Sequence, residues 1–183
     1  MNKLRILPLA LMGAVALNVA ITACGDDDDV NYDNYKQWRE ANQAYFDQQA
    51  EATDAAGKPL YGKYTPVYNS QNTFLMRFVE DPAANADNLQ PLYTSSATVN
   101  YKVHLYDGTP IDSGYHYTTA LNSAYLISGW SEAVTRMHVG DTTEVILPYM
   151  LGYGVTTSGG VPPFSVLRFN LRLVDVPTYE VRP

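Results

Sequence analysis

The chain has 183 residues, of which 46% are apolar and 17% are charged, and its formal net charge is -7. This balance predicts one packed domain with an extension and excludes a largely disordered polypeptide. An acidic chain without clusters of Lys and Arg is a poor nucleic-acid binder, and the three histidines lie too far apart in sequence for a structural zinc site. We therefore predict no nucleic-acid partner, no metal and no cofactor.

The first 23 residues have the features of a secretory signal. Two basic residues lead into an apolar run over residues 6–20, and small residues follow. A membrane-spanning helix is the alternative, but it needs about 20 apolar residues, and Asn18 interrupts this run. We predict a signal peptide over residues 1–23. Its removal takes 2 of the 12 basic residues and none of the 19 acidic ones, which leaves a net charge of -9.

Cys24 is the only cysteine, so no disulfide can form within the chain. The run Ile21-Thr22-Ala23-Cys24 resembles the lipobox of bacterial lipoproteins. This resemblance implies cleavage before Cys24 and lipidation of its thiol, which would hold the protein on a membrane at about 0.8 kcal/mol per buried methylene. The alternative is a chance cysteine near a cleavage site.

Four aspartates at residues 26–29 follow the predicted lipid anchor. A run of like charges is usually a solvated spacer, so residues 24–33 are predicted to form an acidic flexible tether. An acidic run at this place also resembles the surface-export signal of certain Gram-negative lipoproteins. We therefore predict an outer-membrane lipoprotein at the cell surface, or facing the periplasm if the run does not act as an export signal.

Residues 34–56 are compatible with a helix. They contain no Gly or Pro, and side chains that can share one face recur every three or four residues: Tyr35, Trp38, Ala41, Ala44, Tyr45 and Gln48. Gly57 and Pro59 end the pattern. The aromatic stripe predicts that the helix packs onto its own domain or onto a partner copy. Residues 34–72 are assigned to an N-terminal helix and extension.

The rest of the chain is predicted to be a sheet with one short helix. Strands are expected over residues 61–68, 73–79, 97–106, 142–147 and 166–174, a loop over 81–92, and a helix over 131–137 that starts at Ser131. In the strand 97–106, apolar side chains alternate with Asn100, Lys102 and His104. The Asp107-Gly108 pair after it is a strong turn signal.

An ordered series of motifs in this region resembles the FKBP-type peptidyl-prolyl isomerases. The series consists of Val99-Asn100-Tyr101-Lys102, residues 107–113, residues 126–134 with Gly129-Trp130, residues 137–141, residues 148–154, and Val161-Pro162-Pro163 with the strand after it. The resemblance implies an α+β fold in which a curved antiparallel β-sheet wraps around one short α-helix. It places the isomerase domain over residues 73–177 and a tail over 178–183, and it implies proline-containing polypeptides as substrates.

The same resemblance implies roles for individual residues. Trp130 is expected to form the floor of the substrate pocket, and Asp112 to be a buried carboxylate near its rim. By this analogy the catalytic residues are Tyr101, Asp112, Trp130, Tyr153 and Phe169, and the substrate-binding residues are Ile111, Tyr117, Leu126, Ile127 and Val161.

An aromatic pocket can accelerate prolyl isomerisation without a nucleophile or a metal. The X-Pro bond loses its amide resonance as it rotates over a barrier of about 20 kcal/mol. The twisted amide is less polar than the planar one, so a desolvated pocket favours the transition state. The Tyr153 hydroxyl and the Ile127 backbone N–H are the expected donors to the bound peptide.

Each of these residues also has a purely structural interpretation. Trp130 and Phe169 would be ordinary core aromatics, which is the commoner role of such residues. Asp112 has a second reading of about equal weight, in which it only accepts local hydrogen bonds near the turn. Glu132 is interpreted as solvated helix surface or as a helix N-terminal charge rather than as an acid catalyst.

The chain departs from the family pattern at the rim of the expected pocket. Ile111 and Thr119 stand where the family has Phe, Gly152 stands where Ala is usual, and the segment 114–117 is short. These departures predict a wider and less aromatic rim, and they favour the alternative hypothesis of a non-catalytic FKBP-like peptide-binding or chaperone module. The 15 tyrosines suggest a surface glycan-binding protein as a third hypothesis, although tyrosine is also common in strands.

Overall fold

The structure is a computed structural model that describes residues 32–179. The predicted signal peptide, Cys24 and the four aspartates lie outside the described residues. One antiparallel sheet forms the centre of the fold, with its six strands in the order β1-β2-β5-β6-β3-β4. The strands are β1 (Gly62–Tyr64), β2 (Phe74–Phe78), β3 (Ser96–Leu105), β4 (Pro110–Ala120), β5 (Thr142–Leu147) and β6 (Leu167–Thr178).

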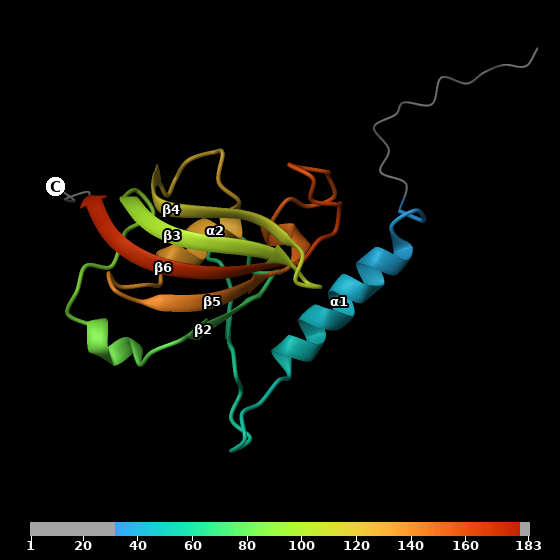
Figure 1. Ribbon diagram of the computed structural model, residues 1–183, viewed down its shortest axis with the longest axis horizontal. Helices are drawn as coiled ribbons and strands as arrows, with labels where there is room; N and C mark the ends of the chain where they lie inside the picture. The colour runs from blue at the N-terminus through green and yellow to red at the C-terminus, as the bar shows by residue number, and fades with distance from the viewer. Residues whose placement is uncertain (1–31, 180–183) are drawn as a thin grey trace, which may run out of the picture.

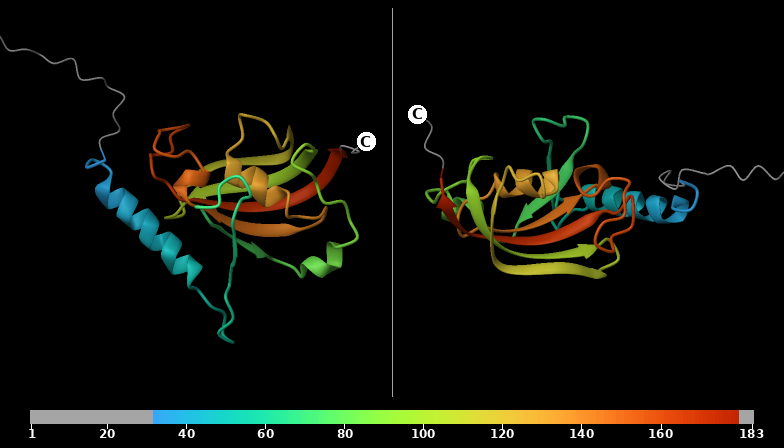
Figure 2. Two further views of the ribbon diagram at one scale, coloured as in Figure 1. Left: turned by 180° about the vertical axis from the view of Figure 1, so that it is seen from behind. Right: turned by 90° about the horizontal axis from the view of Figure 1, so that it is seen from above.

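The sheet curves around the short helix α2 (Ser128–Val134), and a longer helix, α1 (Lys36–Ala50), lies beside one end of the sheet (Figure 1, Figure 2). Two short 3₁₀ helices, η1 (Pro82–Asn85) and η2 (Tyr149–Leu151), lie in the loops before β3 and after β5. This arrangement confirms the predicted α+β fold with its N-terminal helix. Between residues 32 and 179, no helix is long and apolar enough to cross a membrane.

Alternate side chains of the central strands face α2 and form the core. Val99 pairs with Leu173, and Phe169 lies between Val103 and Val145 in the strand register. All five side chains are buried, as period-two alternation predicts for a sheet with a covered face. Burial of each such side chain contributes about 1.5–3 kcal/mol to the free energy of folding. This face of the sheet therefore stabilises the fold and also supports the cavity between the sheet and α2.

Helix α1 packs onto its own domain, which is one of the two arrangements that the aromatic stripe predicted. The Trp38 ring packs edge-on against Tyr106 with centroids 5.2 Å apart, and its indole N–H donates to Ser165 Oγ at 3.2 Å. The buried Asn42 side chain accepts the backbone N–H of Val166 at 2.7 Å. These polar contacts specify where the helix sits, since a buried group without its partner is costly.

Both helices have boundaries that differ from the predicted ones. Helix α1 ends at Ala50 rather than at residue 56, and after it the Asp54 side chain accepts the backbone N–H groups of two nearby residues. Such local bonds compete with helix formation. Helix α2 begins at Ser128 rather than at Ser131, because the Ile127 carbonyl already accepts the N–H groups of Trp130 and Ser131. Ser131 is therefore buried inside the helix.

The sequence does not predict strand β4. This strand is at the edge of the sheet and pairs only with β3, so most of its side chains are exposed and the usual alternation is missing. Val99 pairs with Tyr117 and Tyr101 pairs with Gly114, so two residues of β4 lie opposite the single residue of β3 between these pairs. The extra residue forms a β-bulge, which bends the strand. Within it, His116 has a positive φ of 51° and donates its N–H to Asn100 Oδ1 at 2.7 Å.

Candidate active site

A cavity of about 210 Å³ lies between the sheet and the N-terminal end of α2. Strands β3, β4 and β6, the loop before α2, α2 itself and the segment after η2 all contribute to it. The lining residues are Tyr101, Val103, Ile111, Asp112, Tyr117, Tyr125, Leu126, Ile127, Trp130, Tyr153 and Phe169. Every residue that was predicted for the site lines this cavity except Val161, which is buried in the adjoining core.

Trp130 lines the cavity from α2, which approaches the sheet very closely. The preceding residue, Gly129, has no side chain, and a Cβ there would lie 2.8 Å from a Leu147 methyl group and 2.9 Å from the Leu151 carbonyl oxygen. Only glycine therefore allows this depth of packing. The Trp130 side chain is 4% exposed and Phe169 is 6% exposed, so the base of the cavity is almost dry.

Tyr101 and Asp112 form a fixed pair at the edge of the cavity. The Tyr101 hydroxyl donates to Asp112 Oδ2 at 2.7 Å, and the Ser113 N–H donates to the other carboxylate oxygen at 2.7 Å. Gly114, on the neighbouring strand, makes room for the Tyr101 ring, which a Cβ at that position would overlap. The Tyr101 ring also packs edge-on against Tyr117 with centroids 5.7 Å apart.

The donors that remain available at the cavity include a phenol and a backbone N–H. Among residues 32–179, the Tyr153 hydroxyl and the Ile127 backbone N–H donate to no protein group. Burial, and then the negative charge of Asp112, raise the pKa of Tyr153. Burial, followed by the hydrogen bond to Asp112, raises the pKa of Tyr101 to about 12. Both phenols therefore keep their protons at neutral pH, and only that of Tyr153 is free to donate.

Comparison with known proteins identifies the family. Residues 89–174 match the family model of the FKBP-type peptidyl-prolyl cis-trans isomerases. FK506-binding protein 1 of Dictyostelium discoideum is 35% identical over 92 residues, which are 48% of this chain and 85% of that protein. This chain belongs to the FKBP family of peptidyl-prolyl cis-trans isomerases. The predicted family is therefore confirmed.

The similarity of this chain to known proteins extends beyond residues 89–174. FkpA of Escherichia coli K12 is 29% identical over 149 residues, which are 77% of this chain and 54% of FkpA. A solved peptidyl-prolyl cis-trans isomerase from Pseudomonas syringae pv. tomato has the same fold, with a TM-score of 0.63 and 22% identity over 78% of this chain and 95% of that one. This FKBP spans about half the length of several curated relatives that it matches.

The structure corrects two expectations about acidic residues of this FKBP. Asp112 is exposed rather than buried, because it lies on the edge strand β4, where water reaches one flank. Glu132 is the reverse case. It is 8% exposed rather than solvated, and its carboxylate forms an ion pair with the Arg136 guanidinium one turn along. Glu132 also does not line the cavity, so it is not placed to act on a molecule bound there.

Two lining residues of this FKBP are absent from the predicted set. Val103 lies two residues after Tyr101 on β3, so strand alternation alone could have placed it beside Tyr101. Tyr125 is 99% exposed in the loop before α2, and no periodic pattern marks it. In the described part of the chain, no group of three or more His, Cys, Asp and Glu side chains is placed to hold a metal ion.

Proposed function

We propose that this chain catalyses the cis-trans isomerisation of X-Pro bonds and thereby assists the folding of exported or surface proteins. The observation that carries the proposal is the different hydrogen bonding of two tyrosine hydroxyls at one cavity that the buried Trp130 and Phe169 also line. The Tyr101 hydroxyl is bound to Asp112, whereas the Tyr153 hydroxyl has no protein acceptor among residues 32–179. A free phenol above an apolar base suits an amide carbonyl whose polarity changes during rotation.

The mechanism requires no covalent step. The proline ring enters the cavity and rests on Trp130, which replaces water around the amide with aromatic surface. A less polar, twisted amide loses less by this desolvation than a planar one, so the barrier of about 20 kcal/mol falls. Tyr153 and the N–H of Ile127 each offer a hydrogen bond to the bound peptide. Asp112 holds the Tyr101 ring as part of the wall and does not transfer a proton.

The decisive experiment is an isomerisation assay on a short peptide. The full chain at micromolar concentration is mixed with a tetrapeptide that contains one X-Pro bond, and the exchange between cis and trans forms is followed by NMR. Acceleration that grows in proportion to the enzyme concentration supports the proposal. An exchange rate equal to that of the peptide alone would overturn it.

The rate should be nearly independent of pH in the neutral and mildly alkaline range. Deprotonation of a phenol abolishes its ability to donate, but burial raises the pKa of Tyr153 above its ordinary value of about 10. The loss of activity therefore moves to higher pH, not lower. We expect kcat/KM to vary by less than about twofold between roughly pH 7 and 9.5, measured by the same NMR assay. A decline centred near neutral pH would contradict the role of Tyr153.

A non-catalytic peptide-binding module is the second candidate, because Ile111 lines the cavity where the family has Phe. A smaller side chain at this position leaves the rim less aromatic and the bound proline less enclosed. The same tetrapeptide distinguishes the two functions. Binding of the peptide, detected by NMR shifts of the Trp130 indole, without any faster exchange would favour the binding module.

The sequence of the first residues supports a location in the cell envelope. We propose that Cys24 carries a lipid that anchors the chain to the outer membrane, and that the four aspartates behind it direct it to the cell surface. In fractionated cells, Cys24→Ser should move the protein from the membrane to the soluble fraction. If protease added to intact cells leaves it uncut while a known surface protein is cleaved, the surface location is wrong.

A further inference from the structure

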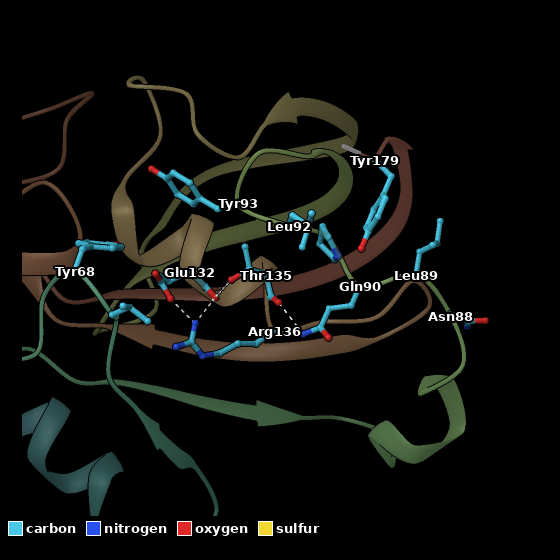
Figure 3. Close-up of a pocket in the computed structure, with 12 residues that line it drawn as sticks. Tyr68, Asn88, Leu89, Gln90, Leu92, Tyr93, Glu132, Thr135, Arg136 and Tyr179 are labelled. Atoms are coloured by element: carbon cyan, nitrogen blue, oxygen red, sulfur yellow. Dashed lines mark hydrogen bonds and ion pairs between the residues drawn. The ribbon is translucent and has the colours of Figure 1, made fainter. Parts of the chain in front are cut away.

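A second and larger hollow, of about 810 Å³, runs along the opposite side of α2 (Figure 3). We call it the α2 groove. Its lining comes from α2 and the turn after it, from residues 67–68 after β1, from residues 88–93 before β3, and from Tyr179 after β6. Glu132 is two residues from Trp130, a rotation of about 200° around the helix. The two residues therefore face different hollows.

The α2 groove presents large side chains that nothing in the described chain covers. Tyr68, Tyr93 and Leu89 are each more than half exposed, and Tyr179 is 42% exposed. Figure 3 shows Tyr68 and Tyr93 toward one end of the groove, and Leu89 and Tyr179 toward the other. Exposed apolar side chains that gather around one hollow are typical of an interaction site.

The described residues that line the α2 groove include one acidic and one basic side chain, and these two are paired. Glu132 and Arg136 form an ion pair with each other, and the Arg136 guanidinium also donates to the Thr65 carbonyl. At the groove wall, the Gln90 side-chain amide donates to the Thr135 carbonyl at 2.9 Å. Among residues 32–179, an anionic ligand would find no unpaired cation here, and a sugar would find no unpaired carboxylate. The groove therefore suits uncharged aromatic, aliphatic or proline side chains.

The α2 groove adjoins the isomerase cavity at the N-terminal end of α2. Ile127 lines the cavity, and Tyr68, which lines the groove, lies near the side chain of the next residue, Ser128. A polypeptide held in the cavity has to continue beyond the reacting bond in both directions. One of these directions leads past Tyr68 into the groove.

We propose that the α2 groove binds an uncharged stretch of the same polypeptide whose X-Pro bond is held in the isomerase cavity. This inference rests on the proposed isomerase function. The groove would act as a second contact that raises the affinity for long, unfolded substrates and contributes nothing for short peptides. Tyrosine rings are suited to this role because they offer a large apolar surface with few rotatable bonds.

The test compares two substrates that share the same X-Pro core. One is a tetrapeptide, and the other has about 20 residues with apolar and aromatic flanks, long enough at about 3.4 Å per residue to reach the groove. In the full chain, Leu89→Ser with Tyr93→Ser should reduce kcat/KM for the long peptide about tenfold through KM, and leave the tetrapeptide unchanged. Tyr115→Ser, at an exposed tyrosine outside both hollows, is the control and should change neither.

Each failure has a distinct meaning. An equal loss on both peptides, or no loss on the long one, would overturn the role of the groove while leaving the isomerase function intact. If the wild-type chain turns over neither peptide, a labelled flank peptide without proline still tests the groove by fluorescence anisotropy. Its dissociation constant should rise at least about fivefold in the double variant. Unchanged affinity for that peptide, or binding of a glycan instead, would refute the proposal.

Discussion

Replacement of Tyr153 by Phe should lower kcat/KM for an X-Pro tetrapeptide about tenfold, with kcat and kcat/KM falling together. The variant keeps the ring and removes only the hydroxyl, which lies at the cavity and has no protein acceptor within residues 32–179. A hydrogen bond of about 1–1.5 kcal/mol corresponds to a roughly fivefold to tenfold change in rate. A parallel fall in kcat identifies a contact that is made in the transition state.

The floor of the cavity should matter as much as the donor. Trp130→Leu shrinks the apolar base and admits water, so combination with Tyr153→Phe should reduce activity by roughly a hundredfold. Circular dichroism before each assay shows whether the double variant is folded. Tyr115→Phe removes a hydroxyl that is exposed outside the cavity, and it should retain full activity. If Tyr153→Phe behaves like this control, the hydroxyl has no part in catalysis.

Gly129→Ala is expected to destabilise the protein by about 1–3 kcal/mol, which is the usual cost of overpacking a core. The sign of this effect is informative, because alanine is the better helix former by about 1 kcal/mol and would stabilise an unconstrained helix. The new methyl group meets the Leu147 side chain and the Leu151 carbonyl, and the carbonyl cannot move away without shifting η2. Urea unfolding followed by fluorescence measures the change in free energy.

A double-mutant cycle isolates the cause. Leu147→Ala alone creates a cavity at a fully buried position and costs about 2–5 kcal/mol. In the double variant Gly129→Ala with Leu147→Ala, the new methyl group gains space, so the combined loss should be smaller than the sum of the single losses. Strict additivity would show that α2 does not press against β5 at this point. If Gly129→Ala displaces Trp130 and thereby lowers activity, the double variant should regain part of that activity.

Local pattern was sufficient for much of the fold. The alternation around Val99 and Val103 predicted the core face of β3, and the strand over residues 142–147 matches β5 at both ends. Both segments lie inside the sheet with one face against the core, so their side chains largely alternate, although Ile146 of β5 is also buried on the opposite face beside Tyr45 and Phe46 of α1. Strand β4 lacks this signal because it is at the edge, with water against most of its side chains.

The set of cavity residues was predicted as an ordered series, but their environments were not. Asp112 and Glu132 show this most clearly. From sequence, Asp112 was expected to be buried, and Glu132 to be solvated helix surface or a helix N-terminal charge. In the structure Asp112 is exposed and Glu132 is buried within α2. Asp112 is exposed because its strand lies at the edge of the sheet. Glu132 can be buried because Arg136, one helical turn away, forms an ion pair with it.

The sequence by itself determined the family and the antiparallel sheet around one helix, and the family resemblance supplied nine of the eleven residues that line the candidate active-site cavity. The resemblance depends on an ordered series of motifs, which one chain displays directly. Only the tertiary structure revealed the free Tyr153 hydroxyl and the α2 groove. Tyr93 and Tyr179 come from segments far apart in the chain, and they share one hollow only because β6 ends beside the loop that leads into β3.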